Sequence, residues 1–325
     1  MIPFLLAGAG GLGLLGGGLA AYSRSTARKI EKAVPRDGAL IEVAGQTIHY
    51  TDDGSGPVIL MIHGLGGQLR NFARPLVEDL ARDYRVVRID RPGSGYSPRA
   101  AGASARLRVQ AETVAELIRI LKLERPLVVG HSLGGALALS LALNHPDLVG
   151  GLALVAPLSQ VQHVEDVPEV FKGLVIRSPA LRRTIAWTIA TPLAVATAER
   201  ALGEVFAPEP APAEFATEGG GLLAIRPGNF YASSTDLMDL EGELEGMVDR
   251  YPALSLPVGL LYGRADNLLD YRLHGERTSS EIPGAELELV EGGHMLPFTQ
   301  PERTAAFVRR TAARLEKPDA RPAAG

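Results

Sequence analysis

The chain has 325 residues, no cysteine, and a formal net charge of −4 from 33 basic and 37 acidic residues. The missing cysteines exclude a disulfide scaffold, a thiolate metal site and a cysteine nucleophile. The slightly acidic balance provides no basic stripe, so we expect no nucleic-acid partner. The hydrophobic content of 46% excludes a disordered chain, and the length predicts two domains or one domain with a large insertion.

The first 23 residues form an apolar leader without a charged side chain, and four basic residues follow it between positions 24 and 32. A helix of that length measures about 34 Å, which is enough to cross the hydrocarbon core of a bilayer. Because the basic residues follow the apolar run, the positive-inside rule predicts a transmembrane anchor over 1–23 and a basic linker over 24–37. The rest of the chain is then expected on the cytoplasmic side of the membrane.

Three alternatives to the anchor stay open. The leader could be a cleaved signal peptide, which would export the protein, or a buried or unstructured segment. It also contains a G-x-G-x-x-G pattern over Gly8–Gly13. A dinucleotide site would need a second strand and an acidic residue about 20 positions later. The sequence that follows is rich in glycine and alanine and then basic, so this alternative is disfavoured.

Short apolar runs alternate with helical patterns from residue 40 onward. The pair Ala44-Gly45 predicts a tight turn between the first two runs, and Pro57–Ile62 is typical of a parallel strand buried on both faces. The alternation predicts an α/β fold with a mainly parallel sheet flanked by helices. The predicted strands are Leu40–Val43, Gln46–Tyr50, Pro57–Ile62, Arg85–Ile89, Leu127–Val129, Leu152–Val155, Val258–Tyr262 and Glu286–Val290, and the predicted helices include Phe72–Leu80, Val114–Leu121, Leu133–Leu143 and Thr304–Leu315.

The alternation stops over residues 158–252, which are predicted to form a mostly helical cap inserted between two core segments, 38–157 and 253–315. The tail 316–325 is rich in proline and alanine and is predicted to be disordered. The apolar side chains of the cap could line a pocket or form the cap's own core. These side chains are Phe171, Leu174, Val175, Leu181, Ile185, Trp187, Ile189 and Leu193.

The most informative motif is Gly130-His131-Ser132-Leu133-Gly134, which fits G-x-S-x-G and lies between a predicted strand and a predicted helix. In such a turn the serine hydroxyl is exposed above the sheet edge, and the glycines let strand and helix approach closely. The helix N-terminus places backbone N–H groups beside a developing oxyanion. The motif therefore predicts Ser132 as a nucleophile.

A serine hydroxyl needs a base, and the base needs an acid that orients it. His294 lies in a glycine-flanked loop after the last predicted strand, and Asp266 directly follows the strand before that one. A loop histidine is otherwise solvated, and an aspartate after a strand otherwise caps a helix. The order Ser132, Asp266, His294 nevertheless predicts a triad, with Asp270 as the alternative acid.

A second glycine-rich loop, His63-Gly64-Leu65-Gly66-Gly67, follows the apolar run Pro57–Ile62. The backbone N–H groups of Leu65 and Leu133 are predicted to converge on the oxyanion, with His63 and Gly64 as supporting residues of the motif. The alternative is an ordinary glycine-rich loop. Because only main-chain donors are needed, the side chains at these positions are loosely constrained.

With these motifs, the chain resembles the α/β-hydrolase superfamily over residues 38–156 and 253–315. The turn Asp90–Ser97 also resembles the D-x-x-G-x-G-x-S turn of that superfamily and is interpreted as structural. The resemblance implies a serine esterase or lipase with an acyl-enzyme intermediate, a small acyl ester as substrate, and no metal or organic cofactor. Related enzymes with an aspartate nucleophile are disfavoured by Ser132.

Three other functions stay open beside the esterase. A C–C bond hydrolase or a perhydrolase would use the same triad, and a non-catalytic binding protein could use the same fold. The uncharged leader and the apolar cap favour lipophilic esters. The acyl chain length, the residues that set specificity and the oligomeric state are not determined by the sequence.

Overall fold

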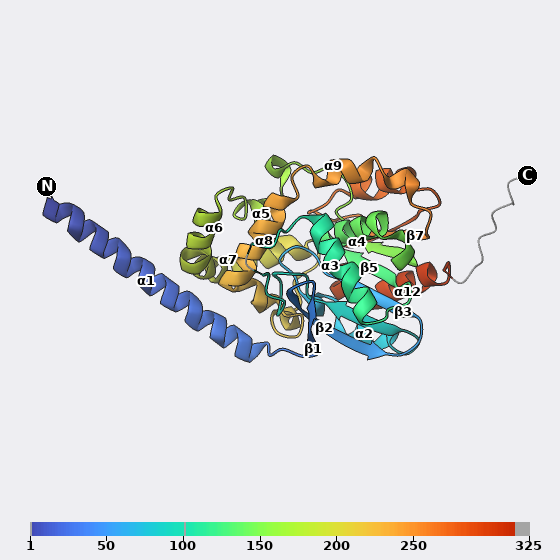
Figure 1. Ribbon diagram of the computed structural model, residues 1–325, viewed down its shortest axis with the longest axis horizontal. Helices are drawn as coiled ribbons and strands as arrows, with labels where there is room; N and C mark the ends of the chain where they lie inside the picture. Colours follow the sequence, from blue (N-terminus) through green and yellow to red (C-terminus); the bar gives the residue numbers. More distant parts are fainter. Residues whose placement is uncertain (1, 101, 316–325) are drawn as a thin grey trace, which may run out of the picture.

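The structure is a computed structural model that describes residues 2–100 and 102–315, with residues 2–13 described by their backbone alone. The predicted tail 316–325 lies outside the described residues. Figure 1 shows a central sheet with helices on both faces, a helical cap beside it, and a long N-terminal helix that runs along the cap. This arrangement is the predicted α/β fold.

The sheet has eight strands in the described part of the chain, in the order β1-β2-β4-β3-β5-β6-β7-β8. The first two strands are antiparallel to their neighbours, and the remaining pairs are parallel. Every predicted strand is confirmed, with bounds within about two residues except for the second, which extends four residues beyond the predicted end at Tyr50. The strands are β1 Ala39–Val43, β2 Gln46–Gly54, β3 Val58–Ile62, β4 Arg85–Ile89, β5 Leu127–His131, β6 Gly151–Val155, β7 Val258–Gly263 and β8 Glu286–Val290.

The turn at Ala44-Gly45 joins β1 to β2, and Val43 pairs directly with Gln46 across it. Both turn residues have positive φ angles, 49° and 76°. Two-residue hairpin turns of this kind match the twist of the flanking strands. The predicted tight turn is therefore confirmed.

Helices cover both faces of the sheet. On one face α3 and α4 pack against β3, β5 and β6 in a cluster that includes Val114 and Leu137. On the other face α2 and α12 form a second cluster that includes Leu76 and Val308. Each fully buried leucine or valine contributes about 1.5–3 kcal/mol, so these two layers hold the core. The helices of the core are α2 Arg74–Leu80, α3 Leu107–Ile120, α4 Leu133–Asn144, α10 Thr278–Glu281, α11 Leu296–Thr299 and α12 Pro301–Ala312, with a π-helix η8 at Arg272–Arg277 and short 3₁₀ turns at Leu69–Asn71 and Pro146–Leu148.

The segment between β6 and β7 is helical, in agreement with the predicted cap. Its helices lie beside the sheet (Figure 1), and some of its residues share a cavity with Ser132, which follows β5. The cap consists of α5 Glu169–Lys172, α6 Pro179–Ile185, the π-helix η4 Ala186–Ala190, α7 Thr191–Phe206, α8 Pro227–Asp239 and α9 Glu243–Val248, with 3₁₀ turns at Val164–Asp166, Ala213–Ala216, Gly221–Ile225 (η6) and Tyr251–Ala253.

The leader belongs to a single helix, α1, which spans Ile2–Ala33. The predicted linker 24–37 is therefore helical over most of its length. The pattern Gly8–Gly13 lies inside this helix and not in a turn between a strand and a helix, so the dinucleotide alternative is wrong. Among the residues that the structure describes, no helix combines the length and the apolar character that crossing a membrane requires.

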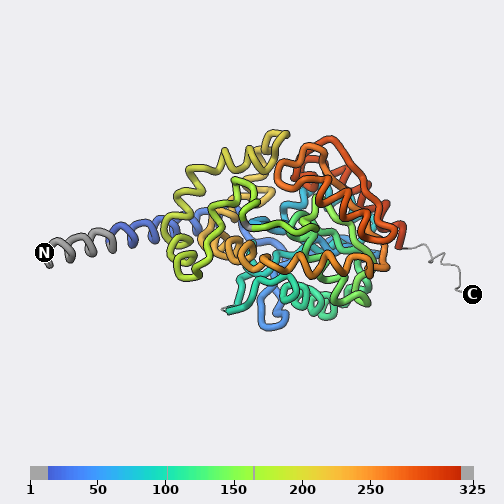
Figure 2. The backbone as a smooth tube through the Cα atoms, turned by 90° about the horizontal axis from the view of Figure 1, so that it is seen from above, coloured from blue at the N-terminus to red at the C-terminus, as the bar shows by residue number. Residues whose placement is uncertain are grey.

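The second half of α1 is held against the cap. Ile30 and Val34 are buried in a small cluster with Leu223 of η6, and the Ser23 hydroxyl donates to the carbonyl of Thr188 at 3.1 Å. Figure 2, seen from above, shows α1 passing along the cap and away from the sheet. The leader helix and the cap therefore form one packed unit.

Candidate active site

Ser132 occupies the turn between β5 and α4, with φ 54° and ψ −122°. A non-glycine residue in this region is strained and persists only where the surrounding structure imposes it. The glycines on either side explain how that turn is built. A Cβ at Gly130 would lie 2.6 Å from the carbonyl oxygen of Gly134, and a Cβ at Gly134 would lie 2.1 Å from that of Ile62. Only glycine lets the strand and the helix approach so closely.

His294 and Asp266 form the hydrogen-bonded pair that the predicted triad requires. The Nδ1–H of His294 donates to Oδ2 of Asp266 at 2.7 Å, and Oδ1 accepts the backbone N–H groups of Leu268 and Leu269 at 2.8 and 3.0 Å. Burial alone would raise the pKa of Asp266, but the charge and hydrogen bond of His294 and the two N–H groups outweigh it and hold that pKa below its ordinary value. The carboxylate therefore stays ionised and fixes the imidazole with Nε2 free.

The alternative acid, Asp270, is not part of this pair. Its carboxylate accepts the backbone N–H of Arg272 and lies 3.8 Å from the Arg272 guanidinium. Asp270 is exposed, whereas Asp266 is buried beside His294. The geometry thus favours Asp266 over Asp270.

Ser132 and His294 line the same cavity. Within the described residues, the Ser132 hydroxyl makes no hydrogen bond to His294. Catalytic hydrogen bonds are often long in a free enzyme and shorten when substrate binds. The structure therefore brings the three residues to one site but does not close the serine–histidine contact.

A second histidine, His131, supports the loop that carries His294. Its Nε2–H donates to the backbone carbonyl of His294 at 3.0 Å, and the two rings lie 4.9 Å apart. Burial, and then the neighbouring His294, lower the pKa of His131 to about 3. A neutral His131 thus positions the loop without adding a charge next to the catalytic imidazole. The motif Gly130–Gly134 alone does not indicate this role for the His131 side chain.

The predicted oxyanion donors, Leu65 and Leu133, lie next to Ser132 in the same cavity. Neither backbone N–H donates to another residue in the described part of the chain. A Cβ at Gly64 would lie 2.9 Å from Cβ of Ser132, so this loop contacts the nucleophile directly. Two free N–H groups beside a serine hydroxyl are the arrangement that stabilises a tetrahedral oxyanion.

His63 holds this loop in place through hydrogen bonds of its imidazole ring. Its Nδ1–H donates to the carbonyl of Gly64 at 2.8 Å, and its Nε2 accepts the backbone N–H of Arg91 at 3.0 Å. Burial, and then the charge of Arg91, lower the pKa of His63 to about 4. His63 is therefore a neutral structural residue and not a second base.

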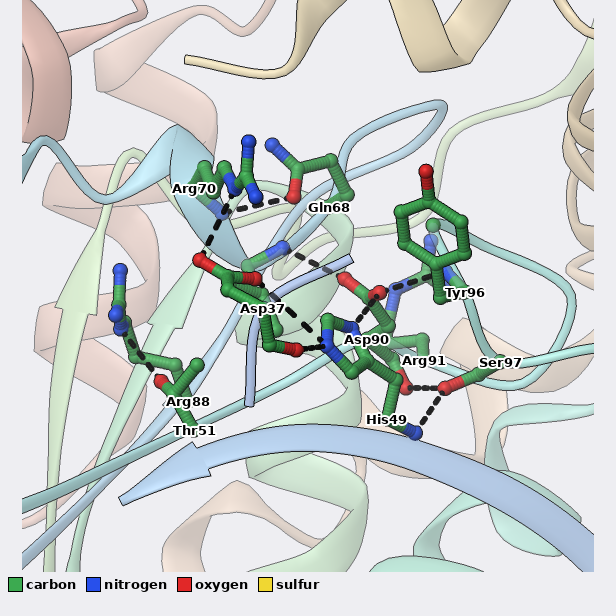
Figure 3. A network of polar contacts seen from close by, with 12 residues as sticks. Asp37, His49, Thr51, Gln68, Arg70, Arg88, Asp90, Arg91, Tyr96 and Ser97 are labelled. Carbon is green, nitrogen blue, oxygen red and sulfur yellow. Dashed lines mark hydrogen bonds and ion pairs between the residues drawn. The ribbon is translucent and has the colours of Figure 1, made fainter. Parts of the chain in front are cut away.

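The turn Asp90–Ser97 has a structural role, as predicted, because it is part of a network of polar contacts (Figure 3). Asp90 accepts hydrogen bonds from His49 and from the backbone of Leu69 and Tyr96, and the Ser97 hydroxyl donates to the Asp90 carbonyl. Burial alone would lower the pKa of His49, but the Asp90 carboxylate and then the backbone and side chain of Asp37 raise it overall. The network joins the segment after α1 to the core.

The cavity holds about 610 Å³ of atom-free space, including its open mouth. Its floor is the catalytic edge of the sheet, and its walls come from two parts of the cap and from the loop after Asp266. Leucine is the most common lining residue. The lining side chains are Leu65, Ser132, Leu133, Leu158, Gln162, Val167, Pro168, Phe171, Leu237, Leu240, Glu241, Leu244, Leu268, Leu269 and His294.

Of the cap residues proposed from the sequence as pocket lining, only Phe171 lines the cavity. Leu181, Ile189 and Leu193 are exposed to solvent. The pocket is instead walled by Leu237, Leu240 and their neighbours at the end of α8. Their apolar spacing of three is a helical signal that the sequence contains. The described residues contain no group of three or more histidine, aspartate or glutamate side chains arranged to hold a metal ion.

Comparison with known proteins places this geometry in a family context. A family model described as "alpha/beta hydrolase fold" matches residues 57–301. An uncharacterized protein of Mycobacterium tuberculosis is 30% identical over 312 residues, which covers 88% of this chain and 85% of that protein. A 2-hydroxymuconate semialdehyde hydrolase of a Pseudomonas strain is 36% identical over 123 residues, covering 37% of this chain and 44% of that enzyme.

Solved structures share the fold at low sequence identity. An esterase of Thermogutta terrifontis superposes with a TM-score of 0.68 and 21% identity, covering 86% of this chain and 100% of that one. A structure titled as a membrane phospholipase A superposes with a TM-score of 0.65 and 24% identity, covering 98% of this chain and 97% of that one. These matches support the architecture around the cavity and leave the substrate open.

Proposed function

Because this chain belongs to the α/β-hydrolase family, we propose that it is a serine hydrolase that cleaves carboxylic esters. The observation that carries the proposal is the strained Ser132 turn beside the 2.7 Å His294–Asp266 pair, with both facing one cavity. Each of the three chemical parts of an acyl hydrolase is then provided by this chain's own residues: a nucleophile, an oriented base and an oxyanion site.

In the proposed reaction, His294 Nε2 accepts the proton of the Ser132 hydroxyl while Oγ attacks the ester carbonyl. Asp266 stabilises the imidazolium that forms, and the N–H groups of Leu65 and Leu133 bind the oxyanion. His294 then gives the proton to the departing alcohol, leaving an acyl group on Ser132. Water attacks this acyl-enzyme with the same base, and the acid is released.

The lining of the cavity supports a lipophilic acyl group as substrate. Its walls are mostly leucine, and its polar lining residues are few: Ser132, His294, Gln162 and Glu241. An apolar wall with a few convergent polar groups is typical of a site that binds a hydrophobic ligand. We therefore expect the rate to increase with acyl chain length until the cavity is filled.

The test is hydrolysis of a series of p-nitrophenyl esters from acetate to dodecanoate by the full-length protein. We expect turnover that peaks at a medium or long chain and falls by several orders of magnitude in Ser132→Ala. The second candidate is C–C bond hydrolysis, favoured by the match to a 2-hydroxymuconate semialdehyde hydrolase. Turnover of a meta-cleavage dienoate faster than of every ester in the series would replace the first proposal with the second.

We also propose that the N-terminal segment brings the protein to a lipid surface. Most of the large apolar side chains exposed in the described part of the chain lie on α1 and on the adjoining cap helices. These are Leu14, Leu15, Tyr22, Leu181, Ile189, Leu193 and Val195. An apolar surface of this kind marks an interaction site, and the uncharged leader 1–23 followed by basic residues favours anionic lipid as the partner.

Liposome flotation tests the lipid proposal. We expect the full-length protein to float with vesicles containing anionic lipid, and Ile189→Asp together with Leu193→Asp to weaken that binding. Leu40→Asp together with Ile120→Asp is the matched control, because those exposed side chains lie on β1 and at the end of α3, outside the cap and α1. Equal binding by both double variants would reject the cap as part of the surface.

The basic residues after the leader also favour a catalytic domain on the cytoplasmic side, with export as the alternative. Protease added to intact cells that produce the protein should leave the catalytic domain uncut in the first case. Cleavage of the domain by external protease would support export.

A further inference from the structure

Arg91 connects the oxyanion loop to the cap and is fully buried, with 0% of its surface exposed. Its guanidinium donates from Nη2 to the carbonyl of Gly64 at 3.0 Å and from Nε to the carbonyl of His63 at 3.1 Å. On the opposite side, Nη1 donates to Oδ2 of Asp236 in α8 at 2.9 Å and to Gln110 at 3.1 Å. One side chain thus holds two consecutive carbonyls of the loop and one carboxylate of the cap.

The contact with Gly64 matters because of peptide geometry. The carbonyl of Gly64 and the N–H of Leu65 belong to the same planar trans peptide unit, so they point in opposite directions. When Arg91 fixes the carbonyl on one side, it fixes the direction of the Leu65 N–H on the other side. That N–H donates to no other residue in the described part of the chain, and Leu65 lines the cavity of Ser132.

The backbone of Arg91 adds a second constraint on the same peptide. Its N–H donates to Nε2 of His63, which leaves Nδ1–H as the donor of that ring to the Gly64 carbonyl. The N–H of Gly67 also donates to this carbonyl, at 3.3 Å. The Gly64 oxygen therefore has three donors, and two of them depend on Arg91.

Stability alone does not explain the buried pair of Arg91 and Asp236. Replacing a buried ion pair with apolar side chains of similar volume is often neutral or stabilising. This pair also makes α8 part of the arrangement, because Leu237, the next residue after Asp236, lines the catalytic cavity. The carboxylate holds the guanidinium in the one position from which it reaches the loop.

We propose that Arg91 is a positioning residue for ester hydrolysis, which aligns the Gly64–Leu65 peptide so that the Leu65 N–H meets the oxyanion. The inference rests on the proposed serine hydrolase function. It assigns to the turn after β4 a role in transition-state stabilisation beyond the structural role that the sequence predicts. Because the oxyanion forms only in the transition state, loss of Arg91 acts on kcat and leaves KM nearly unchanged.

The decisive variant is Arg91→Met, and the chain offers a matched control in Arg99→Met. Both arginines pair with Asp236 and are mostly buried, so each variant leaves the carboxylate with one arginine partner and with Gln110. Arg99 donates to the Pro92 carbonyl, and within the described residues it makes no hydrogen bond to the oxyanion loop. Only Arg91→Met therefore removes the side-chain hydrogen bonds to the carbonyls of His63 and Gly64, together with the one to Gln110.

We expect Arg91→Met to lower kcat on the best p-nitrophenyl ester about 10–100-fold with KM within about threefold, since complete loss of an oxyanion donor lowers kcat about 10²–10³-fold. Arg99→Met should leave kcat within about threefold. Arg91→Lys should lose as much kcat as Arg91→Met, because a single ammonium does not bridge Asp236 and Gly64. Equal kcat loss in Arg91→Met and Arg99→Met, or full activity in Arg91→Lys, would overturn the proposal.

A fluorophosphonate probe separates this inference from the ester proposal. The probe forms a charged phosphoryl oxygen in the oxyanion site as it reacts with Ser132, whatever the natural substrate is. Arg91→Met should be labelled about 10–100-fold more slowly than the wild type, and Arg99→Met at the wild-type rate. Labelling of the wild type without hydrolysis of any ester would reject the ester proposal alone, whereas a wild type that does not label would reject both.

Discussion

The core and the cap both contribute to one cavity, but they do so in different ways. The core supplies the groups that we propose to react, Ser132, Asp266 and His294, from turns at the carboxyl ends of β5, β7 and β8. The cap supplies apolar walls, chiefly from α8 and the segment before α5. Chemistry therefore depends on short, sterically demanding turns, whereas the shape of the pocket depends on how separate helices pack.

The largest effect is expected in the core, at the acid of the triad. Asp266→Asn keeps the size of the side chain but removes the charge that stabilises the imidazolium, and kcat should fall about 10⁴-fold. Asp270→Asn is the control, because that residue lies four positions on and pairs with Arg272. Steady-state kinetics of both variants checks the assignment, and equal loss in both would make Asp270 part of the machinery.

A methyl group should have opposite effects in the two regions. In Gly134→Ala the new Cβ would lie 2.1 Å from one backbone oxygen and 2.6 Å from another, and we expect a loss of about 4 kcal/mol or more in the free energy of unfolding. In Gly228→Ala, within α8, the Cβ has nothing within 4 Å, and stability should rise by up to about 1 kcal/mol. Urea unfolding measures both changes; a tolerated Gly134→Ala would contradict the elbow geometry.

Stability should fall in acid because of buried neutral histidines. Burial lowers the pKa of His63 and His274 to about 4 and that of His131 to about 3. Below about pH 6.5 the unfolded chain binds protons at these residues while the folded chain does not, so each one destabilises the fold by about 2 kcal/mol between pH 6.5 and 5. His49, with its raised pKa, acts in the opposite direction and only partly offsets the three.

Urea midpoints measured against pH check this behaviour. His274→Gln should make the dependence shallower between pH 6.5 and 5, because one of the three buried neutral rings is gone. The exposed His163→Gln is the control and should leave the curve unchanged. An identical pH dependence in the wild type and His274→Gln would show that His274 titrates normally in the folded protein.

The smallest effect is expected in the cap, on chain-length preference. Leu237→Ala removes part of the pocket wall and should lower kcat/KM for an octanoyl ester about tenfold relative to an acetyl ester. Leu193→Ala, at an exposed leucine of α7, should change that ratio by less than about twofold. The ratio of the two esters is the readout, so a shared loss of stability cancels. A larger effect at Leu193 would move the acyl pocket to the other side of the cap.

The same contrast explains what could be predicted from the sequence. The strands, the elbow at Ser132 and the Ser–Asp–His order follow from local patterns, because a buried strand and a glycine-flanked turn are each specified by adjacent residues. The residues that line the pocket could not be predicted from local patterns, because the face that a cap helix turns to the core depends on its packing partners. Leu193 and Leu237 belong to similar helical patterns, and only the second faces Ser132.

Arg91 was missed for a related reason. The turn after β4 matched a structural pattern, and nothing in that pattern indicates that its arginine is fully buried. The sequence does contain a feature that indicates a buried partner for this arginine: Asp236 is an acidic residue next to apolar residues at the end of α8. The contact between Arg91 and Asp236 joins positions 145 residues apart, and no single window of sequence contains both.

The backbone of Ser132 has one further consequence, which concerns how this protein can change. The nucleophile occupies a conformation that glycine adopts freely and other residues adopt under strain of about 1–3 kcal/mol. Glycine at this position would relax the turn and abolish the hydroxyl, so the inactive protein would be the more stable one. Selection for stability and selection for activity are thus opposed at a single residue, and the tightly packed glycines around it keep the active form in place.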